Sequence, residues 1–172
     1  MMSNPTDYGE VDTTIRNLMT TLTGKDGLAR KRARDELVEI GRPAVPQLLE
    51  ALKDKRTYVR WEAAKALSEI GDPRAAEGLV VALSDNDPGI RWMAAEGLIA
   101  AERQGLPPLL EALLEHGEST RLREGARHVL NVLAKNEKLP QEVAPVLQAL
   151  HSAQPATEAP RAAKMALEAL AH

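Results

Sequence analysis

Apolar residues recur along the chain at helical spacing, in units of roughly thirty residues. An alanine anchors each unit, a leucine follows four residues later, and a further apolar residue usually stands seven residues after the anchor. This i, i+4, i+7 spacing marks one face of an α-helix. The anchors are Ala33, Ala63, Ala94, Ala126 and Ala163, which stand 30, 31, 32 and 37 residues apart. The near-constant spacing predicts an array of stacked helical units.

Each unit is predicted to contain two helices. The first helix carries the anchor stripe and ends near Gly41 or Gly71, because a left-handed C-cap favours glycine. The second helix opens with a proline, as at Pro73, where Asp72 can serve as N-cap. We therefore expect ten helices, near residues 10–22, 27–40, 44–53, 57–70, 73–84, 88–102, 106–115, 120–134, 140–151 and 160–170.

A single helix pair of this size cannot bury its own apolar face, so the pairs must stack side by side. We expect one all-α domain over residues 1–172, an α-α superhelix of about five helix pairs. The helix within residues 10–26 has no repeat signature and is predicted to cap the N-terminal end. The segment "SAQPATEAP" is predicted to be a connector to a last small-residue helix. The predicted repeats cover 27–56, 57–87, 88–118 and 119–153, and the C-terminal cap covers 154–172.

The stretch "VRWEAAKALSEIGDPRA" at residues 59–75 resembles the HEAT-like repeat named after phycobilisome lyases. The resemblance covers roughly residues 27–170 and implies a HEAT-like solenoid. It does not specify one function, because the family includes scaffolds, adaptors and lyase subunits.

Composition and charge narrow the function classes. Aromatic residues make up only 2% of the chain, so leucine, alanine, valine and isoleucine must fill the interior, as suits packed helices. The absence of cysteine excludes disulfides, cysteine-bound zinc and thiol catalysis. A formal net charge of −3 lacks the basic excess typical of nucleic-acid binding, so we expect no nucleic-acid partner.

The N-terminal residues show no signal-peptide pattern, and no apolar stretch approaches the roughly 20 residues that span a bilayer. We therefore expect a cytoplasmic protein with no membrane partner.

An arginine precedes four of the five anchors by three residues. On a helical wheel of ~100° per residue, Arg60 falls at the edge of the buried arc around Val59 and needs a partner. A guanidinium can bind a carboxylate and turn carbonyls together, so we predict a structural ladder between repeats. Anion binding is the alternative. The ladder consists of the arginines Arg30, Arg60, Arg91 and Arg123 with the inter-repeat aspartates Asp54, Asp85 and Asp87.

Trp61 and Trp92 occupy matching positions in adjacent units, outside the buried arc. Each indole either folds across a neighbouring alanine and seals the groove between repeats, or belongs to an exposed apolar patch that binds a protein. The surface of the second helices is the other candidate. It is smooth and mildly acidic, and Gln47, Glu50 and Glu111 are predicted to contact a basic or neutral partner there.

No catalytic, cofactor-binding or metal-binding residue is predicted. The four histidines show no metal-ligand spacing, and no nucleophile or phosphate-loop motif occurs. We therefore predict a protein that is not an enzyme, a scaffold or adaptor that binds another protein or peptide. The alternative that the resemblance permits is a subunit of a bilin lyase or a related chromophore-handling enzyme. A role in nucleic-acid repair is a third alternative.

Overall fold

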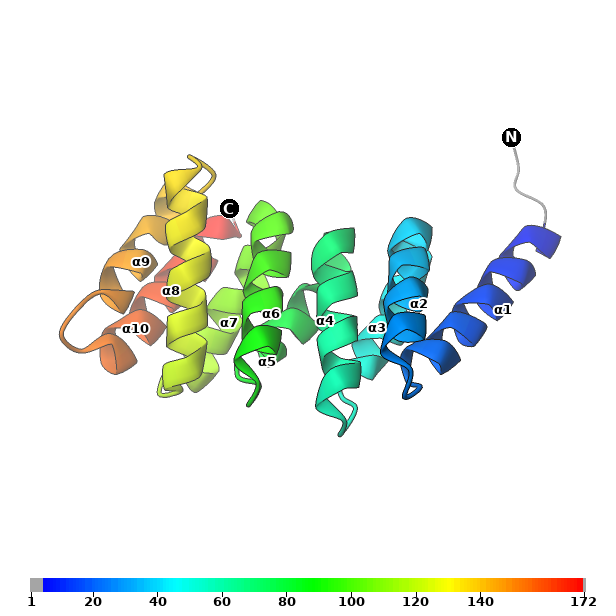
Figure 1. Cartoon of the computed structure of the whole chain (residues 1–172). Coiled ribbons are helices and arrows are strands. Elements are labelled where there is room, and N and C mark those ends of the chain that lie inside the picture. The colour runs from blue at the N-terminus through cyan, green and yellow to red at the C-terminus, as the bar shows by residue number, and fades with distance from the viewer. Residues whose placement is uncertain (1–4, 172) are drawn as a thin grey trace.

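The computed structural model describes residues 5–171, with side chains from residue 9 onward. The described chain is built from α-helices and short 3-10 turns and contains no strand, so the predicted all-α class is confirmed (Figure 1). The α-helices are α1 (Pro5–Leu22), α2 (Gly27–Ile40), α3 (Val45–Ala51), α4 (Thr57–Ile70), α5 (Ala76–Ala82), α6 (Pro88–Ala100), α7 (Leu106–His116), α8 (Thr120–Lys135), α9 (Ala144–Leu150) and α10 (Pro155–Leu170).

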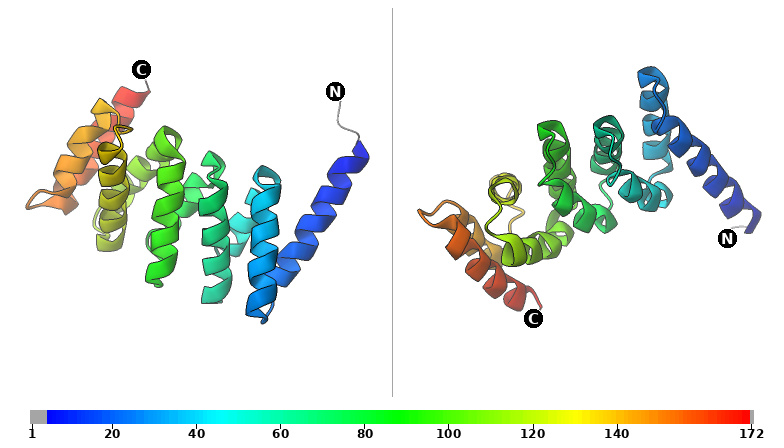
Figure 2. Two further views of the ribbon diagram at one scale, coloured as in Figure 1. Left: turned by 45° about the horizontal axis from the view of Figure 1, so that its top comes forward. Right: turned by 90° about the horizontal axis from the view of Figure 1, so that it is seen from below.

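The helices form two layers. The first helices of the repeats, α2, α4, α6 and α8, stand side by side in one layer, and the shorter α3, α5 and α7 lie behind them (Figure 1). Within the first layer α4 packs on both α2 and α6, and α6 packs on α8. The two further views show that the helix pairs follow one another along an elongated, curved array (Figure 2). In the described part of the chain, no helix combines the length and hydrophobicity that crossing a bilayer requires.

The core follows the repeat pattern. The five anchor alanines are each at most 2% exposed, and the leucines that follow the first four are equally buried. Small anchors let the helices of one layer approach closely. At Gly97 in α6, an added Cβ would lie 2.7 Å from Leu79 Cδ1 and 3.3 Å from the Cα of Ser68 in α4, so glycine gives this crossing its close approach.

The C-terminal end departs from the regular stack. Helix α10 packs against both α7 and α9, and the ring of Pro160 fills the space that a Cβ on Gly117 would occupy. The helix begins at Pro155, so it contains part of the segment that we expected to be a connector. Proline at the first turn loses no hydrogen bond, and Pro160 gives up one inside the helix. Helix α1 also begins earlier than expected, at Pro5.

A residue with positive φ stands at or just after the end of each of the four first-layer helices α2, α4, α6 and α8. Only two of these four residues are glycines. Gly41 and Gly71 have φ of 71° and 63°, whereas Glu102 and Glu137 have φ of 50° and 59°. A residue with a Cβ pays a steric cost of about 1–2 kcal/mol in this region. The later repeats therefore carry backbone strain that the earlier repeats avoid.

We expect Glu137→Gly to raise the free energy of unfolding by about 0.5–1 kcal/mol, because glycine removes the Cβ clash at a small entropic cost. Glu137 suits this test better than Glu102, whose carboxylate binds Lys138 at 2.6 Å. Urea denaturation measures the change. The control Glu124→Gly, at an exposed position inside α8, should lower the free energy of unfolding by about 1 kcal/mol. Equal losses in the two variants would contradict the strain at residue 137.

Candidate functional site

Each arginine of the predicted ladder donates from Nη1 to backbone carbonyl oxygens of the turn that precedes its helix. The donor–acceptor distances run from 2.6 to 3.2 Å, and the acceptors lie five or six residues before the arginine. The acceptors are Gly24 and Lys25 for Arg30, Asp54 and Lys55 for Arg60, Asp85 and Asn86 for Arg91, and Gly117 for Arg123. A repeated hydrogen-bond pattern therefore holds each turn against the first turn of the following helix.

The three predicted aspartates have different partners. Arg60 donates from Nε and Nη2 to the carboxylate of Asp85, in the turn between α5 and α6, at 2.7 and 3.1 Å. The carboxylate of Asp54 binds Arg56 instead, and that of Asp87 accepts the backbone N–H groups of Gly89 and Ile90 as the N-cap of α6. The structure thus joins one of the three carboxylates to a ladder arginine by side-chain contact.

The electrostatics of Asp85 reflect two opposing effects. Burial raises the pKa of Asp85, because it disfavours the charged form, but hydrogen bonds from Arg60 and from the backbone N–H of Asp87, together with the charges of Arg60 and Arg91, outweigh burial. The pKa of Asp85 therefore lies below its ordinary value. At neutral pH the Arg60–Asp85 pair is fully charged.

A buried ion pair between α2 and α4 was missed by the sequence reasoning. Arg34 Nη1 lies 2.8 Å from Glu62 Oε2, and the two residues are only 8% and 6% exposed. Arg30 Nε approaches the other oxygen of the same carboxylate at 3.5 Å. One signal in the sequence could have revealed this pair. Arg34 directly follows the buried anchor Ala33, and Glu62, of opposite charge, directly precedes the buried anchor Ala63.

The two tryptophans differ in exposure. The indole of Trp61 is half-buried, with its Nε1 3.2 Å from the place where a Cβ on Gly89 would lie. Trp92 is 52% exposed, and its ring centroid lies 4.9 Å from that of His128 in α8. Each indole therefore reaches from its own helix toward the next helix of the first layer, but Trp92 keeps a large open surface.

Trp92 borders a groove between α4 and α6 of about 390 Å³. We call it the tryptophan groove; its lining residues are Lys65, Ser68, Glu69, Trp92, Met93, Glu96, Ile99 and Ala100. At its rim, Lys65 binds Glu69 at 3.0 Å, and His128 Nε2 lies 3.5 Å from Glu96 Oε1. The lining is half polar and half apolar, and the exposed part of the indole can hold a flat ligand by stacking.

The second-helix residues of the prediction fall at separate places. Gln47 and Glu50 of α3 line a pocket of about 620 Å³ against α1, together with Arg16, Met19, Thr20 and Pro46. Glu111 is exposed on α7 and does not line that pocket. Among the described residues, no cluster of three or more histidine, aspartate or glutamate side chains could hold a metal ion.

The HEAT repeats family matches residues 15–99 of the chain, and the two-layer helical array extends the same architecture to both ends. The chain is a HEAT-like repeat protein. The resemblance inferred from residues 59–75 is thereby confirmed.

This HEAT-like repeat protein is similar to two bilin-related proteins. It is 40% identical over 67 residues to phycocyanobilin lyase subunit beta of Nostoc sp. (strain PCC 7120), across 38% of this chain and 34% of the relative. It is 42% identical over 67 residues to bilin biosynthesis protein RpcF of Synechococcus sp. (strain WH8020), across 38% and 32%. The matched region therefore spans about a third of the length of each relative.

A solved structure shares nearly the whole fold. A chain in the complex of CpcE and CpcF of phycocyanin lyase from Nostoc sp. PCC7120 is 25% identical, with a TM-score of 0.58. The overlap covers 90% of this HEAT-like repeat protein and 98% of that chain.

These comparisons correct two predictions. The expectation of a scaffold or adaptor and the expectation that the chain is not an enzyme are both wrong, because the two relatives are named for a bilin lyase and for bilin biosynthesis. The residues that repeat along the chain specify how helices pack, and they are common to enzymes and scaffolds. The lack of a familiar catalytic motif therefore does not exclude an activity.

Proposed function

We propose that this HEAT-like repeat protein is a subunit of a bilin lyase or of a closely related enzyme that handles bilins. The observation that carries the proposal is the overlap with a chain of the CpcE–CpcF complex of phycocyanin lyase over 90% and 98% of the two chains. The identity of 40% with a phycocyanobilin lyase subunit, over 67 residues, supports the same assignment.

The solved complex also supports a function that requires a protein partner. It contains two different proteins, CpcE and CpcF, so we propose that this chain functions together with a second subunit. A curved two-layer array offers separate surfaces for a ligand and for a partner.

We place the bilin at the tryptophan groove. A bilin is an open-chain tetrapyrrole with flat conjugated rings, pyrrole N–H donors and propionate groups. The exposed indole of Trp92 can stack on a pyrrole ring, and the carboxylate of Glu96 can accept a pyrrole N–H. The ammonium of Lys65 can bind a propionate if it gives up its partly exposed ion pair with Glu69. The groove of about 390 Å³ lies within the range of small-molecule sites.

Titration with biliverdin tests the proposal. We expect wild-type protein to shift the visible absorption of the bilin, and Trp92→Ala to weaken binding about five- to tenfold through lost stacking and lost apolar contact. The matched control is Met165→Ala, which removes another exposed apolar side chain on the distant helix α10 and should leave affinity within about twofold.

The two parts of the proposal fail separately. A bilin spectrum that wild-type protein leaves unchanged would count against bilin handling altogether. Equal affinity of Trp92→Ala and wild type for biliverdin would show that the bilin does not bind at the tryptophan groove. The assignment as a lyase subunit would be unaffected.

A further inference from the structure

His128 lies where the tryptophan groove meets α8, and its ring contacts two groups of α6. The ring centroids of His128 and Trp92 are 4.9 Å apart, and His128 Nε2 lies 3.5 Å from Glu96 Oε1. Trp92 and Glu96 stand one helical turn apart on the same face of α6, and both line the groove. A single imidazole therefore contacts both the stacking group and the acceptor that we assign to the bilin.

The Nε2 atom of His128 is shielded from solvent and makes no hydrogen bond with any described residue. A shielded polar atom without a partner is costly. Its distance of 3.5 Å from Glu96 Oε1 exceeds the roughly 2.7–2.9 Å of a charge-assisted hydrogen bond. A protonated imidazole carries a hydrogen on both ring nitrogens, so a small movement of these two partly exposed side chains would close the gap and satisfy Nε2.

Glu96 provides the only carboxylate within 4 Å of the His128 ring nitrogens in the described chain, and none from α7, α9 or α10 comes as close. On α8 itself, Glu124 stands one turn earlier and Arg127 directly precedes the histidine, and both are exposed. His151, directly after α9, forms its hydrogen bond three residues further along α8. A charge on His128 therefore acts mainly on Glu96.

The net charge of the tryptophan groove depends on this histidine. The charged lining residues are Lys65, Glu69 and Glu96, and Lys65 already binds Glu69 at 3.0 Å. Beside a neutral His128 the carboxylate of Glu96 is uncompensated and repels the propionates of a bilin. Beside a protonated His128 this repulsion is removed, and the second oxygen of the carboxylate stays free to accept a pyrrole N–H.

We propose that His128 is a positioning residue of the tryptophan groove and that its protonation makes the groove bind bilins more tightly. Protonation draws the carboxylate of Glu96 toward α8 and fixes the indole of Trp92 by a cation–π contact. Because histidine changes charge between about pH 5 and pH 8, bilin affinity rises as the pH falls through this range. The ligand in this inference rests on the proposed function, whereas the coupling between His128 and Trp92 belongs to the chain alone.

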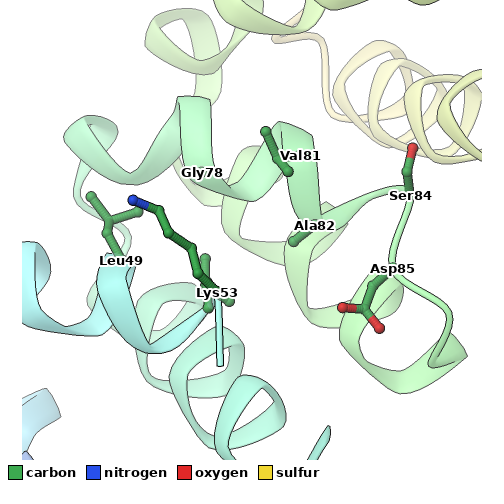
Figure 3. Close-up of a pocket in the computed structure, with 8 residues that line it drawn as sticks. Leu49, Lys53, Gly78, Val81, Ala82, Ser84 and Asp85 are labelled. Carbon is green, nitrogen blue, oxygen red and sulfur yellow. The ribbon is translucent and has the colours of Figure 1, made fainter. Parts of the chain in front are cut away.

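The pocket between α3 and α5 offers a comparison without such a residue. It encloses about 380 Å³, and Figure 3 shows Leu49 and Lys53 on its α3 side and Val81 on its α5 side. No histidine lines it, and despite burial the pKa of its Asp85 lies below the ordinary value, because hydrogen bonds to the carboxylate outweigh burial. A bilin bound in this pocket would therefore show no dependence on His128.

The first experiment follows the emission of Trp92 without a ligand, in a Trp61→Phe background that leaves a single tryptophan. A protonated imidazole in contact with an excited indole accepts an electron and quenches its emission. We expect the emission to fall between about pH 8 and pH 5 with one midpoint, and to stay nearly constant in His128→Gln. Glu96→Gln should move the midpoint to lower pH by about half a unit, because the protonated imidazole loses its carboxylate. The control His116→Gln removes an exposed histidine of α7 and should titrate as the background does.

The second experiment measures the affinity for biliverdin at about pH 6 and about pH 8 by visible absorption. The titration of biliverdin itself is common to all variants, so the ratios of the two affinities are compared. The ratio of the affinity at pH 6 to that at pH 8 should be about three- to fivefold larger in wild type than in His128→Gln. His128→Arg keeps a planar cation and should bind biliverdin more tightly than His128→Gln at both pH values.

Circular dichroism verifies that each variant is folded, and if His128→Gln unfolds, the midpoint shift in Glu96→Gln carries the test. Emission that titrates unchanged in His128→Gln would overturn the inference. Equal affinity ratios in wild type and His128→Gln would also overturn it, and would leave the proposed function intact because biliverdin still binds. Absence of biliverdin binding at both pH values would overturn the proposed function together with the inference that rests on it.

Discussion

Replacing Glu62 by alanine is expected to lower the free energy of unfolding by about 3–5 kcal/mol. The substitution removes the buried carboxylate that lies 2.8 Å from Arg34 Nη1 between α2 and α4, and leaves this guanidinium with only the part-exposed Asp35, at 2.9 Å from Nη2. Arg34 is 8% exposed, so water cannot replace that partner without opening the helix crossing. Urea denaturation followed by circular dichroism measures the loss.

The control for Glu62 is on the same helix. Glu69→Ala removes the partner of Lys65, but this pair is partly exposed and should contribute no more than about 0.5 kcal/mol. Replacing both buried partners, as Arg34→Met/Glu62→Leu, should recover much of the loss, because Arg34 no longer lacks a partner and Arg30 keeps its hydrogen bonds to the carbonyls of Gly24 and Lys25. A loss in Glu62→Ala no larger than in Glu69→Ala would show that the buried pair does not stabilise the crossing.

Replacing Arg60 by alanine is expected to lower the free energy of unfolding by about 2–3 kcal/mol. The variant loses the two hydrogen bonds to Asp85 and the two to the carbonyls of Asp54 and Lys55. It also leaves Asp85, a largely buried carboxylate, without its cation. Thermal denaturation tests this result against Arg32→Ala, an exposed arginine of α2 whose loss should change stability by less than about 0.5 kcal/mol. Unchanged stability in Arg60→Ala would refute the ladder.

The contribution of Arg60 should also depend on pH in a defined direction. The pKa of Asp85 is lowered in the folded state, since hydrogen bonds from Arg60 and a backbone N–H outweigh the effect of burial. A depressed carboxyl pKa gives stability that is complete above the unfolded value of about 3.9 and is lost as pH falls through the folded pKa. The difference between wild type and Arg60→Ala should therefore be constant at neutral pH and shrink below about pH 4.

Much of the fold followed from periodicity. The anchor alanines and their leucines have to be buried for any pair to stack, and the structure buries them. The largest errors lie at the two ends, where α1 starts at Pro5 and α10 at Pro155. Within the array, the predicted helices 73–84 and 140–151 are each a 3-10 turn followed by a shorter α-helix, α5 or α9. The repeat pattern is weakest at the two ends. Pro160 looked like a helix breaker, and its contact with Gly117, more than forty residues earlier in the chain, has no local signature.

The candidate site was only partly predictable. The arginines were recognisable from their register, but their carboxylate partners were not, because Asp54 had a nearer arginine in Arg56 and Asp87 was needed as an N-cap. The tryptophans occupy matching sequence positions, yet one is half-buried and the other 52% exposed. Their exposure depends on what the following helix presents, which is Gly89 for Trp61 and His128 for Trp92.

The helix periods, the stacking of pairs and the register of the turn-binding arginines can be read from the sequence, because they depend on spacing along one helix or one turn. The burial of the Arg34–Glu62 pair and the groove beside Trp92 cannot be read from it. Each of these features forms where side chains from helices about thirty residues apart in the sequence meet. Which side chains meet depends on how the helices pack in the two layers, and no local pattern specifies that packing.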